Sequence, residues 1–209
     1  MSGQGLFITL EGVEGAGKST LMNFIAEALT QADKDVLLTR EPGGTKTGEQ
    51  IRTILLDSNN IGLTDDTELL LIFSAMAQHI SEIISPALAA GKLVLCDRFT
   101  DASYAYQGSG RGIQAVRIQQ LEEWVQQGLK PDLTLLFDLD VEIGLRRAGK
   151  RSEADRFEQE EIGFFERIRS CYLERAEQES ERFRVIDASK PLDDVKQQIL
   201  NILNSRGLC

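Results

Sequence analysis

The stretch Gly12-Val13-Glu14-Gly15-Ala16-Gly17-Lys18-Ser19 limits the folds open to this chain more than any other feature. It follows an apolar run at residues 6–10, which we predict to be a buried strand, and it precedes apolar residues at helical spacing. The glycines let the loop curl until its backbone N–H groups point at one centre, and the next helix adds its positive dipole end. The pattern G-x-x-x-x-G-K-[ST] between a strand and a helix therefore predicts a phosphate-binding P-loop at 12–19.

Individual residues of the loop extend this prediction. Lys18 can bridge the outer phosphates of a nucleotide, and the Ser19 hydroxyl can bind Mg²⁺. The residues expected to hold the phosphates are Gly12, Val13, Glu14, Gly15, Ala16, Gly17, Lys18, Ser19 and Thr20. Because P-loops serve kinases, motor ATPases and GTPases alike, the rest of the chain has to distinguish these classes.

Five short apolar runs alternate with longer helical patterns along the chain. The runs expected to be buried strands are residues 6–10, 36–39, 93–96, 133–137 and 183–186. Alternation of this kind predicts an α/β fold with a parallel sheet covered by helices on both faces. The length of 209 residues suits one domain over 1–209, and no repeat or linker divides it.

Composition excludes several other classes of protein. The net charge of −10 argues against a nucleic-acid polymer or an anionic membrane as partner, because such binders carry excess Lys and Arg. The N-terminus lacks the pattern of a signal peptide, and the longest apolar-rich stretch, from Leu69 to Ala77, is too short to span a membrane. Three widely spaced cysteines and a single histidine do not form a zinc set, so we expect a reduced cytoplasmic protein.

The stretch from Leu69 to Ala77 is apolar on every side except at Ser74. A helix without a polar face is buried, either within its own chain or against a second copy. The sequence leaves these two alternatives open.

The distribution of arginine favours a kinase. The guanine motif N-K-x-D of GTPases is absent, and the length leaves no room for the machinery of a motor ATPase. A kinase with a phosphorylated acceptor needs a second anion site, and Arg40, Arg52, Arg98 and Arg111 lie where loops or strand ends are expected. The segment 146–156 holds five cations against two acids, which indicates either a phosphate-binding segment or a solvated helix end.

Two of the expected strands run directly into an aspartate. Asp97 is followed by Arg98 and a polar stretch, so it is the better candidate for holding Mg²⁺ through water. Asp138 is the alternative, although it could equally cap the helix expected from Val141.

Six segments together resemble one family. They are residues 11–20, 39–45, 97–99, 105–108, 110–112 and 155–158. The segments Arg40-Glu41-Pro42-Gly43-Gly44-Thr45 and Asp97-Arg98-Phe99 are much more specific than the P-loop. Over essentially the whole chain, the sequence resembles bacterial thymidylate kinase, of the nucleoside monophosphate kinase group.

The resemblance implies a reaction and an assembly. The reaction is transfer of the ATP γ-phosphoryl group to dTMP, giving dTDP and ADP with Mg²⁺, in the supply of dTTP for DNA synthesis. The implied structure is a P-loop NTPase three-layer fold with a five-stranded parallel sheet and a mobile lid at about 146–157. The resemblance also implies a homodimer, which would cover the helix from Leu69 to Ala77.

The resemblance assigns roles to particular residues as well. Arg98 would hold the acceptor phosphate with Arg52 as a second clamp, and the implied catalytic residues are Lys18, Arg98, Arg151 and Glu14. The implied dTMP-binding residues are Glu41, Arg52, Phe73, Arg98, Ser103, Tyr106 and Gln107. Phe73 could equally be an ordinary core residue, because the ring near the base often lies one residue earlier in this family.

Two positions bear on how far the resemblance extends. The P-loop lacks the catalytic arginine that some members carry there, so Arg151 in the lid would meet the charge on the transferring group, with Arg147 as the runner-up. Met76 stands where many relatives have an arginine near the bound nucleotide. The alternatives are a kinase for another monophosphate such as dUMP, or a nucleotide-binding switch that phosphorylates no small molecule.

Overall fold

The computed structural model describes residues 5–60, 62–149 and 155–209. Five strands form one parallel sheet in the order β2-β3-β1-β4-β5. They are β1 (Leu6–Glu11), β2 (Val36–Arg40), β3 (Leu93–Asp97), β4 (Leu133–Asp138) and β5 (Phe183–Asp187). All five predicted strands are confirmed, and each runs one residue further, into a charged side chain at the carboxyl edge of the sheet.

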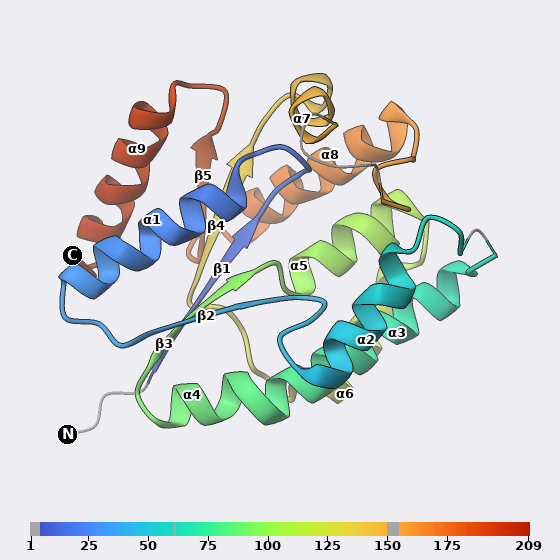
Figure 1. The fold of residues 1–209 in the computed structure, drawn as a ribbon, viewed down its shortest axis with the longest axis horizontal. Helices are drawn as coiled ribbons and strands as arrows, with labels where there is room; N and C mark the ends of the chain where they lie inside the picture. The colour runs from blue at the N-terminus through green and yellow to red at the C-terminus, as the bar shows by residue number, and fades with distance from the viewer. Residues whose placement is uncertain (1–4, 61, 150–154) are drawn as a thin grey trace.

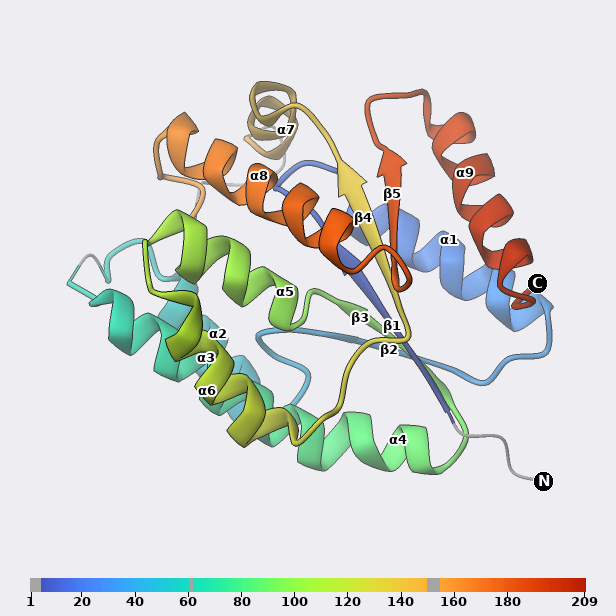
Figure 2. The ribbon, with the colours of Figure 1, turned by 180° about the vertical axis from the view of Figure 1, so that it is seen from behind.

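Helices cover both faces of the sheet, as predicted. Helices α1 (Lys18–Gln31) and α9 (Leu192–Ser205) lie on one face, and α8 (Ile162–Gln178) lies on the other (Figures 1 and 2). The remaining helical segments are α2 (Lys46–Leu56), α3 (Asp65–His79), η1 (Ile80–Ile84), α4 (Ser85–Ala89), α5 (Thr100–Ser103), η2 (Tyr104–Gly110), α6 (Ala115–Gln126) and α7 (Val141–Ala148). The fold is therefore a three-layer α/β arrangement around one parallel sheet.

Two apolar cores flank the central strands. The larger core joins the sheet to α1, α8 and α9, through residues such as Leu10, Ile25 and Phe165. The smaller core joins β3 to α3 and α6, through Phe99 and Ile118 among others. Because β1 and β3 are neighbours at the centre, the loops that follow them meet where the two cores adjoin.

The helix that the sequence singled out is longer than expected and has two different sides. With η1 and α4 it makes a continuous helical stretch, Asp65–Ala89, that is long and apolar enough to cross a membrane by length and composition. Core helices pass the same test, and 44% of its most apolar window is buried in the protein. Its buried Glu68 and His79 have polar partners elsewhere in the fold, whereas Leu70 is 55% exposed. Only part of the apolar surface is therefore covered within the chain.

Candidate active site

A cavity of about 330 Å³ opens at the carboxyl edge of the sheet. The P-loop, the loop after β2, helices α2 and α3, the turn after β3 and the start of η2 all contribute to its wall. Its lining residues are Glu14, Gly15, Ala16, Gly17, Lys18, Ser19, Glu41, Pro42, Arg52, Leu55, Leu56, Ile72, Met76, Asp97, Arg98, Phe99, Ala102, Ser103, Tyr106, Gln107, Ala148, Asp155, Phe157 and Glu158. The volume is that of a pocket for a small organic ligand.

The backbone of the P-loop requires glycine at Gly15. Its φ is +70°, a region that L-residues rarely adopt, and a Cβ there would lie 1.9 Å from the Gly144 carbonyl oxygen. Gly17, with φ +88°, then leads into α1, whose first residue is Lys18. The loop therefore curls tightly against α7 and turns the N-terminus of α1 toward the cavity.

Lys18 is buried at the bottom of the loop. Its Nζ donates to the Gly12 carbonyl at 2.7 Å and to the Val13 carbonyl at 2.9 Å, so one of its three N–H donors remains for a ligand. Burial lowers the pKa of Lys18 to about 8, and the nearby Arg98 charge adds to this effect. An anion in the cavity would favour the charged form of the lysine.

Arg98 faces Lys18 from the turn that follows β3. Its φ of +69° is unusual for a residue with a side chain, and its backbone N–H donates to the Leu10 carbonyl at 2.9 Å. The guanidinium donates to Glu14 Oε1 at 2.9 Å and lies over the Tyr106 ring, 4.6 Å from its centroid. Tyr106 in turn directs its hydroxyl to the same carboxylate, 2.7 Å from both oxygens. Glu14, Arg98 and Tyr106 thus form one hydrogen-bonded cluster on the cavity wall.

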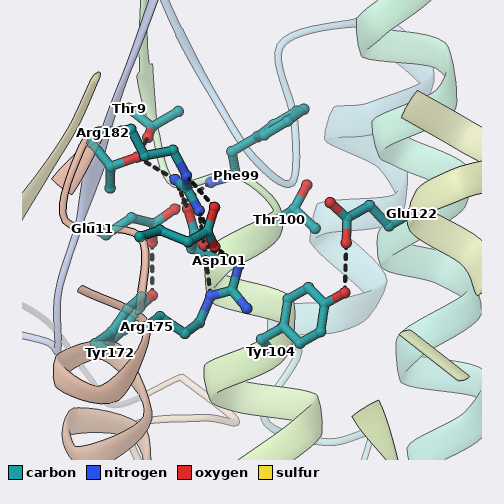
Figure 3. Close-up of polar contacts among 12 residues, drawn as sticks. Thr9, Glu11, Phe99, Thr100, Asp101, Tyr104, Glu122, Tyr172, Arg175 and Arg182 are labelled. Carbon is teal, nitrogen blue, oxygen red and sulfur yellow. Dashed lines mark hydrogen bonds and ion pairs between the residues drawn. The ribbon is translucent and has the colours of Figure 1, made fainter. Parts of the chain in front are cut away.

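Buried Glu11 fixes the turn that carries Arg98. Its carboxylate accepts from the Phe99 N–H at 2.8 Å and from the Tyr172 hydroxyl at 2.7 Å (Figure 3). The Tyr172 hydroxyl also accepts a hydrogen bond from Arg98 at 3.2 Å. Burial, together with the charge of Asp101, raises the pKa of Glu11 to about 8. Glu11 therefore holds the turn directly through the Phe99 N–H, and it holds the Arg98 guanidinium indirectly through Tyr172.

A second buried carboxylate supports this region from further behind. Asp101, which is 2% exposed, accepts from both Arg175 and Arg182 at 2.7 Å (Figure 3). Burial alone would raise the pKa of Asp101, but the two guanidinium groups outweigh it and lower the pKa. Pairing of this kind is what makes a fully buried carboxylate tolerable.

The opposite wall of the cavity is assembled from several elements. Arg52 of α2 donates to the Pro42 carbonyl at 3.0 Å, and burial lowers its pKa. Gln107 of η2 donates to Glu68 of α3 at 2.8 Å. Ser103 at the end of α5 is buried and lines the cavity. This wall thus offers one cation and several neutral polar groups.

Comparison with known proteins assigns this architecture to a family. The family model described as thymidylate kinase matches residues 10–199. The chain is 58% identical over 201 residues to a thymidylate kinase of Ectopseudomonas mendocina, covering 96% of each chain. It is 56% identical over 199 residues to one of Alcanivorax borkumensis, covering 95% of this chain and 96% of that relative.

The chain belongs to the thymidylate kinase family. The crystal structure of thymidylate kinase from Ehrlichia chaffeensis has a TM-score of 0.80 and 31% sequence identity to it, covering 96% of this chain and all of that one. The family resemblance and the fold that the sequence predicted are therefore confirmed.

Most of the predicted site residues of this thymidylate kinase family member lie around one cavity. Those that line it are Glu14, Gly15, Ala16, Gly17, Lys18, Ser19, Glu41, Arg52, Asp97, Arg98, Ser103, Tyr106 and Gln107. Gly12 and Val13 lie beneath the lining and contribute the carbonyls that Lys18 contacts, whereas Thr20 is exposed outside it. The structure thus brings together both halves of the predicted site.

Phe73 is placed differently from the predicted binding role. Its side chain is 2% exposed, belongs to the smaller core and faces the groove between α3 and α6. On α3, Ile72 and Met76 line the cavity instead. A one-residue step turns a helical side chain by about 100°, so Phe73 cannot share the face of Ile72.

The remaining arginines that the sequence considered have protein partners. Arg40 pairs with Glu49 at 2.7 Å on the surface, and Arg111 pairs with Glu160 and Glu68. Neither lines the cavity. The predicted anion site therefore contains Arg52 and Arg98 only, of these four.

The two strand-end aspartates also differ. Asp97 lines the cavity, and its Oδ1 is buried without a hydrogen-bond partner in the described part of the chain. Asp138 accepts two hydrogen bonds from Arg169, at 2.6 and 2.9 Å, away from the cavity. The cap of α7 is Asp140 rather than Asp138. Of the two aspartates, Asp97 therefore lines the cavity and Asp138 does not, and the metal role of Asp97 stays a prediction.

The predicted lid is only partly described. Arg151 lies outside the described residues, and the runner-up Arg147 donates to the Ala188 carbonyl at 3.3 Å rather than lining the cavity. Arg156 is bound to Glu68 at 2.5 Å. Phe157 and Glu158 line the cavity, and the Asp155-Arg156-Phe157-Glu158 motif was the signal that could have identified them.

Proposed function

We propose that this chain transfers the γ-phosphoryl group of ATP to dTMP, giving dTDP and ADP. The observation that carries this proposal is that Lys18 and Ser19 of the P-loop share one cavity with Arg98 and Arg52. ATP carries three phosphates and dTMP carries one, so a kinase for this pair needs two anion sites in the same cavity. Phosphoryl transfer is catalysed mainly by positioning and by stabilising the charge that develops on the moving group.

The P-loop side holds the donor phosphates. Backbone N–H groups around Gly15 and Gly17 and the N-terminus of α1 bind phosphate oxygens, and Lys18 gives its remaining N–H to the outer phosphates. Glu14 of this loop accepts hydrogen bonds from Arg98 and Tyr106, which hold the Arg98 guanidinium in place before the nucleotides bind.

The opposite side holds the acceptor. Arg98 binds the acceptor phosphate beside the transferring group, and Arg52 binds it from α2. Ser103, Tyr106 and Gln107 face the nucleoside, as does Glu41 in the loop after β2. The apolar Ile72 and Met76 supply the surface against which a base can pack.

The residues present fit a magnesium ion that accompanies ATP. Ser19 and Asp97 offer a hydroxyl and a carboxylate on the cavity wall, and oxygen ligands are those that Mg²⁺ prefers. Asp97 Oδ1 has no hydrogen-bond partner among the described residues, so Asp97 would hold the ion through water. When bound, the metal neutralises charge on the phosphates.

The lid is proposed to complete the site. Arg151 would meet the charge on the transferring phosphoryl group and exclude water when the segment closes. Arg151→Ala should then lower kcat more than it weakens dTMP binding. The reverse pattern would assign Arg151 to ground-state binding instead.

We propose a homodimer whose interface is formed by α3 and α6. We also propose that the protein lies in the reducing cytoplasm. Leu70 is 55% exposed and Trp124 is 75% exposed, and both line a groove between the two helices. Large apolar side chains exposed together are typical of a contact surface. Light scattering should give twice the chain mass of 23.2 kDa at micromolar concentration, and the single-chain mass would contradict the dimer.

The proposed reaction is tested by coupled ADP release over a panel of nucleoside monophosphates. We expect dTMP to give the highest kcat/KM and to exceed the ATP-only background clearly. Turnover of dUMP or another monophosphate without turnover of dTMP would move the assignment to that substrate. Nucleotide binding without turnover of any monophosphate would favour the switch protein.

A further inference from the structure

His79 is the single histidine of the chain, and it is fully buried at the last residue of α3. Its Nδ1 lies 2.5 Å from Glu41 Oε1, and its Nε2 lies 2.5 Å from Thr39 Oγ1. Thr39 belongs to β2, and Glu41 begins the loop after it. The imidazole therefore connects α3 to the loop that lines the cavity.

The loop after β2 is closed tightly around this ring. Gly44 has φ +74°, and a Cβ there would lie 2.4 Å from His79 Nε2. Arg52 holds the same loop from the cavity side through the Pro42 carbonyl. His79 and Arg52 thus fix the loop from two directions.

The two oxygens of Glu41 have different surroundings. Oε1 is engaged by His79, whereas Oε2 is buried and has no hydrogen-bond partner among residues 5–60, 62–149 and 155–209. A buried acceptor without a partner is costly, and Glu41 lines the cavity. A hydrogen-bond donor on a ligand in the cavity would remove that cost.

The hydrogen bonds also indicate where the protons are. When the Glu41 carboxylate is ionised it only accepts, and Nδ1 then carries the proton that lies between the two groups. The Thr39 hydroxyl can donate to Nε2 when the imidazole is neutral. Thr39, His79 and Glu41 can therefore form a continuous chain of hydrogen bonds that ends at the cavity.

We propose that His79 is a positioning residue for the acceptor nucleoside. It holds Glu41 Oε1 so that Oε2 accepts a hydrogen bond from a sugar hydroxyl or a base N–H of the monophosphate. This role rests on the proposed function, since it assumes that the nucleoside lies beside Glu41. It concerns the nucleoside and not the phosphates, so its loss affects the monophosphate and not ATP.

Two amide substitutions at His79 test the roles of its two ring nitrogens separately. The amide of His79→Asn takes the place of Nδ1 and can still donate to Glu41, whereas that of His79→Gln takes the place of Nε2 and reaches Thr39 only. We expect His79→Gln to raise KM for dTMP about 10-fold or more, the loss of one hydrogen bond to a charged group. His79→Asn should stay within about threefold of the wild type, and both variants should keep KM for ATP within about twofold. The control is Gln78→Ala, because Gln78 is the exposed neighbour of His79 and its side chain donates to Glu82 at 2.8 Å.

The single histidine gives a second measurement that needs no variant. In ¹⁵N-labelled wild-type protein, all imidazole resonances belong to His79. We expect them to shift when dTMP is added and to stay in place when a non-hydrolysable ATP analogue is added alone.

The outcomes separate this role from the proposed reaction. The positioning role would be overturned by equal KM values for dTMP in the Asn and Gln variants, or by imidazole resonances that do not shift when dTMP is added. The proposed reaction would still stand if the wild type phosphorylates dTMP. A wild-type chain that turns over no monophosphate would overturn the reaction, and the role of His79 with it. If neither variant folds, the resonance shift decides.

Discussion

The two halves of the cavity are built in different ways. The donor half is one continuous segment, the P-loop at 12–19, and most of its binding groups are backbone atoms shaped by glycine conformations. The acceptor half combines side chains from α2, from η2 and from the loops after β2 and β3, and these side chains are held by partners on other elements. The contrast teaches that a backbone site is visible as a local motif, whereas a side-chain site depends on how the elements pack.

The largest effect should follow from removing Lys18, the one cationic side chain of the donor half. Lys18→Ala should lower kcat/KM by more than about 100-fold, about 3 kcal/mol of transition-state stabilisation, because no other lysine lines the described cavity. Steady-state kinetics with dTMP and ATP measure this change. A loss below about tenfold would show that the backbone alone binds the donor.

Arg98→Ala tests whether the acceptor half depends as strongly on a single charge. We expect a loss of kcat/KM of about 100-fold, since Arg98, which pairs with Glu14, is the residue proposed to bind the acceptor phosphate. Arg169→Ala is the control, because Arg169 pairs with Asp138 away from the cavity. Near-normal activity of Arg98→Ala would contradict the clamp.

Gly15→Ala tests the claim that the donor half is a backbone site. A Cβ at Gly15 would meet the Gly144 carbonyl, while Gly112, with φ +80°, has nothing within 4 Å of its Cβ. Gly112→Ala is the control. In both variants the left-handed backbone conformation should lower the free energy of unfolding by about 1–2 kcal/mol. Gly15→Ala adds a backbone clash and should lower it by about 3 kcal/mol or more. Urea denaturation compares the two. Equal losses would mean that the loop can shift to accept a side chain.

Arg52→Ala sharpens the comparison within the acceptor half. Arg52 is proposed as the second clamp on the acceptor phosphate, so we expect KM for dTMP to rise about 10-fold while KM for ATP changes little. Arg40→Ala is the control, because Arg40 pairs with Glu49 on the surface. An increase in KM for ATP as large as that for dTMP would place Arg52 in both halves.

The smallest effect concerns Glu11, which lies between the two halves. Because its pKa is raised to about 8, it stabilises the fold most when protonated, and that stability is lost as the pH rises from about 4.5 to about 8. Glu11→Gln should therefore become more stable relative to the wild type as the pH rises from about 5 to about 8. Urea denaturation midpoints at about pH 5 and about pH 8 measure this difference in stability. The control is Glu27→Gln, because Glu27 is exposed. An unchanged difference would show that Glu11 stays ionised throughout.

The sequence located the strands well but ended each of them one residue early. Apolar runs identify buried strands, and the last residue of each strand here is charged because it reaches the carboxyl edge of the sheet. Glu11 and Asp97 at this edge are functional candidates for that reason. Periodicity cannot show that a charged residue still belongs to the ladder.

Helical phase explains why Phe73 does not line the cavity. The stretch from Leu69 to Ala77 is apolar on nearly every side, so its composition does not distinguish the face toward the cavity from the face toward the smaller core. Packing against α6 and β3 decides that Ile72 and Met76 face the cavity and that Phe73 does not.

By itself, the sequence determined the P-loop, the parallel sheet and the family, because local spacing and backbone conformation are written in consecutive residues. Only the tertiary structure decided which charges are available to a ligand. Arg40, Asp97 and Asp138 each end a strand. Glu49 pairs with Arg40 and Arg169 pairs with Asp138, whereas Asp97 Oδ1 has no hydrogen-bond partner in the described part of the chain. Charges find partners through space, and which partner is nearest depends on packing between elements distant in the chain.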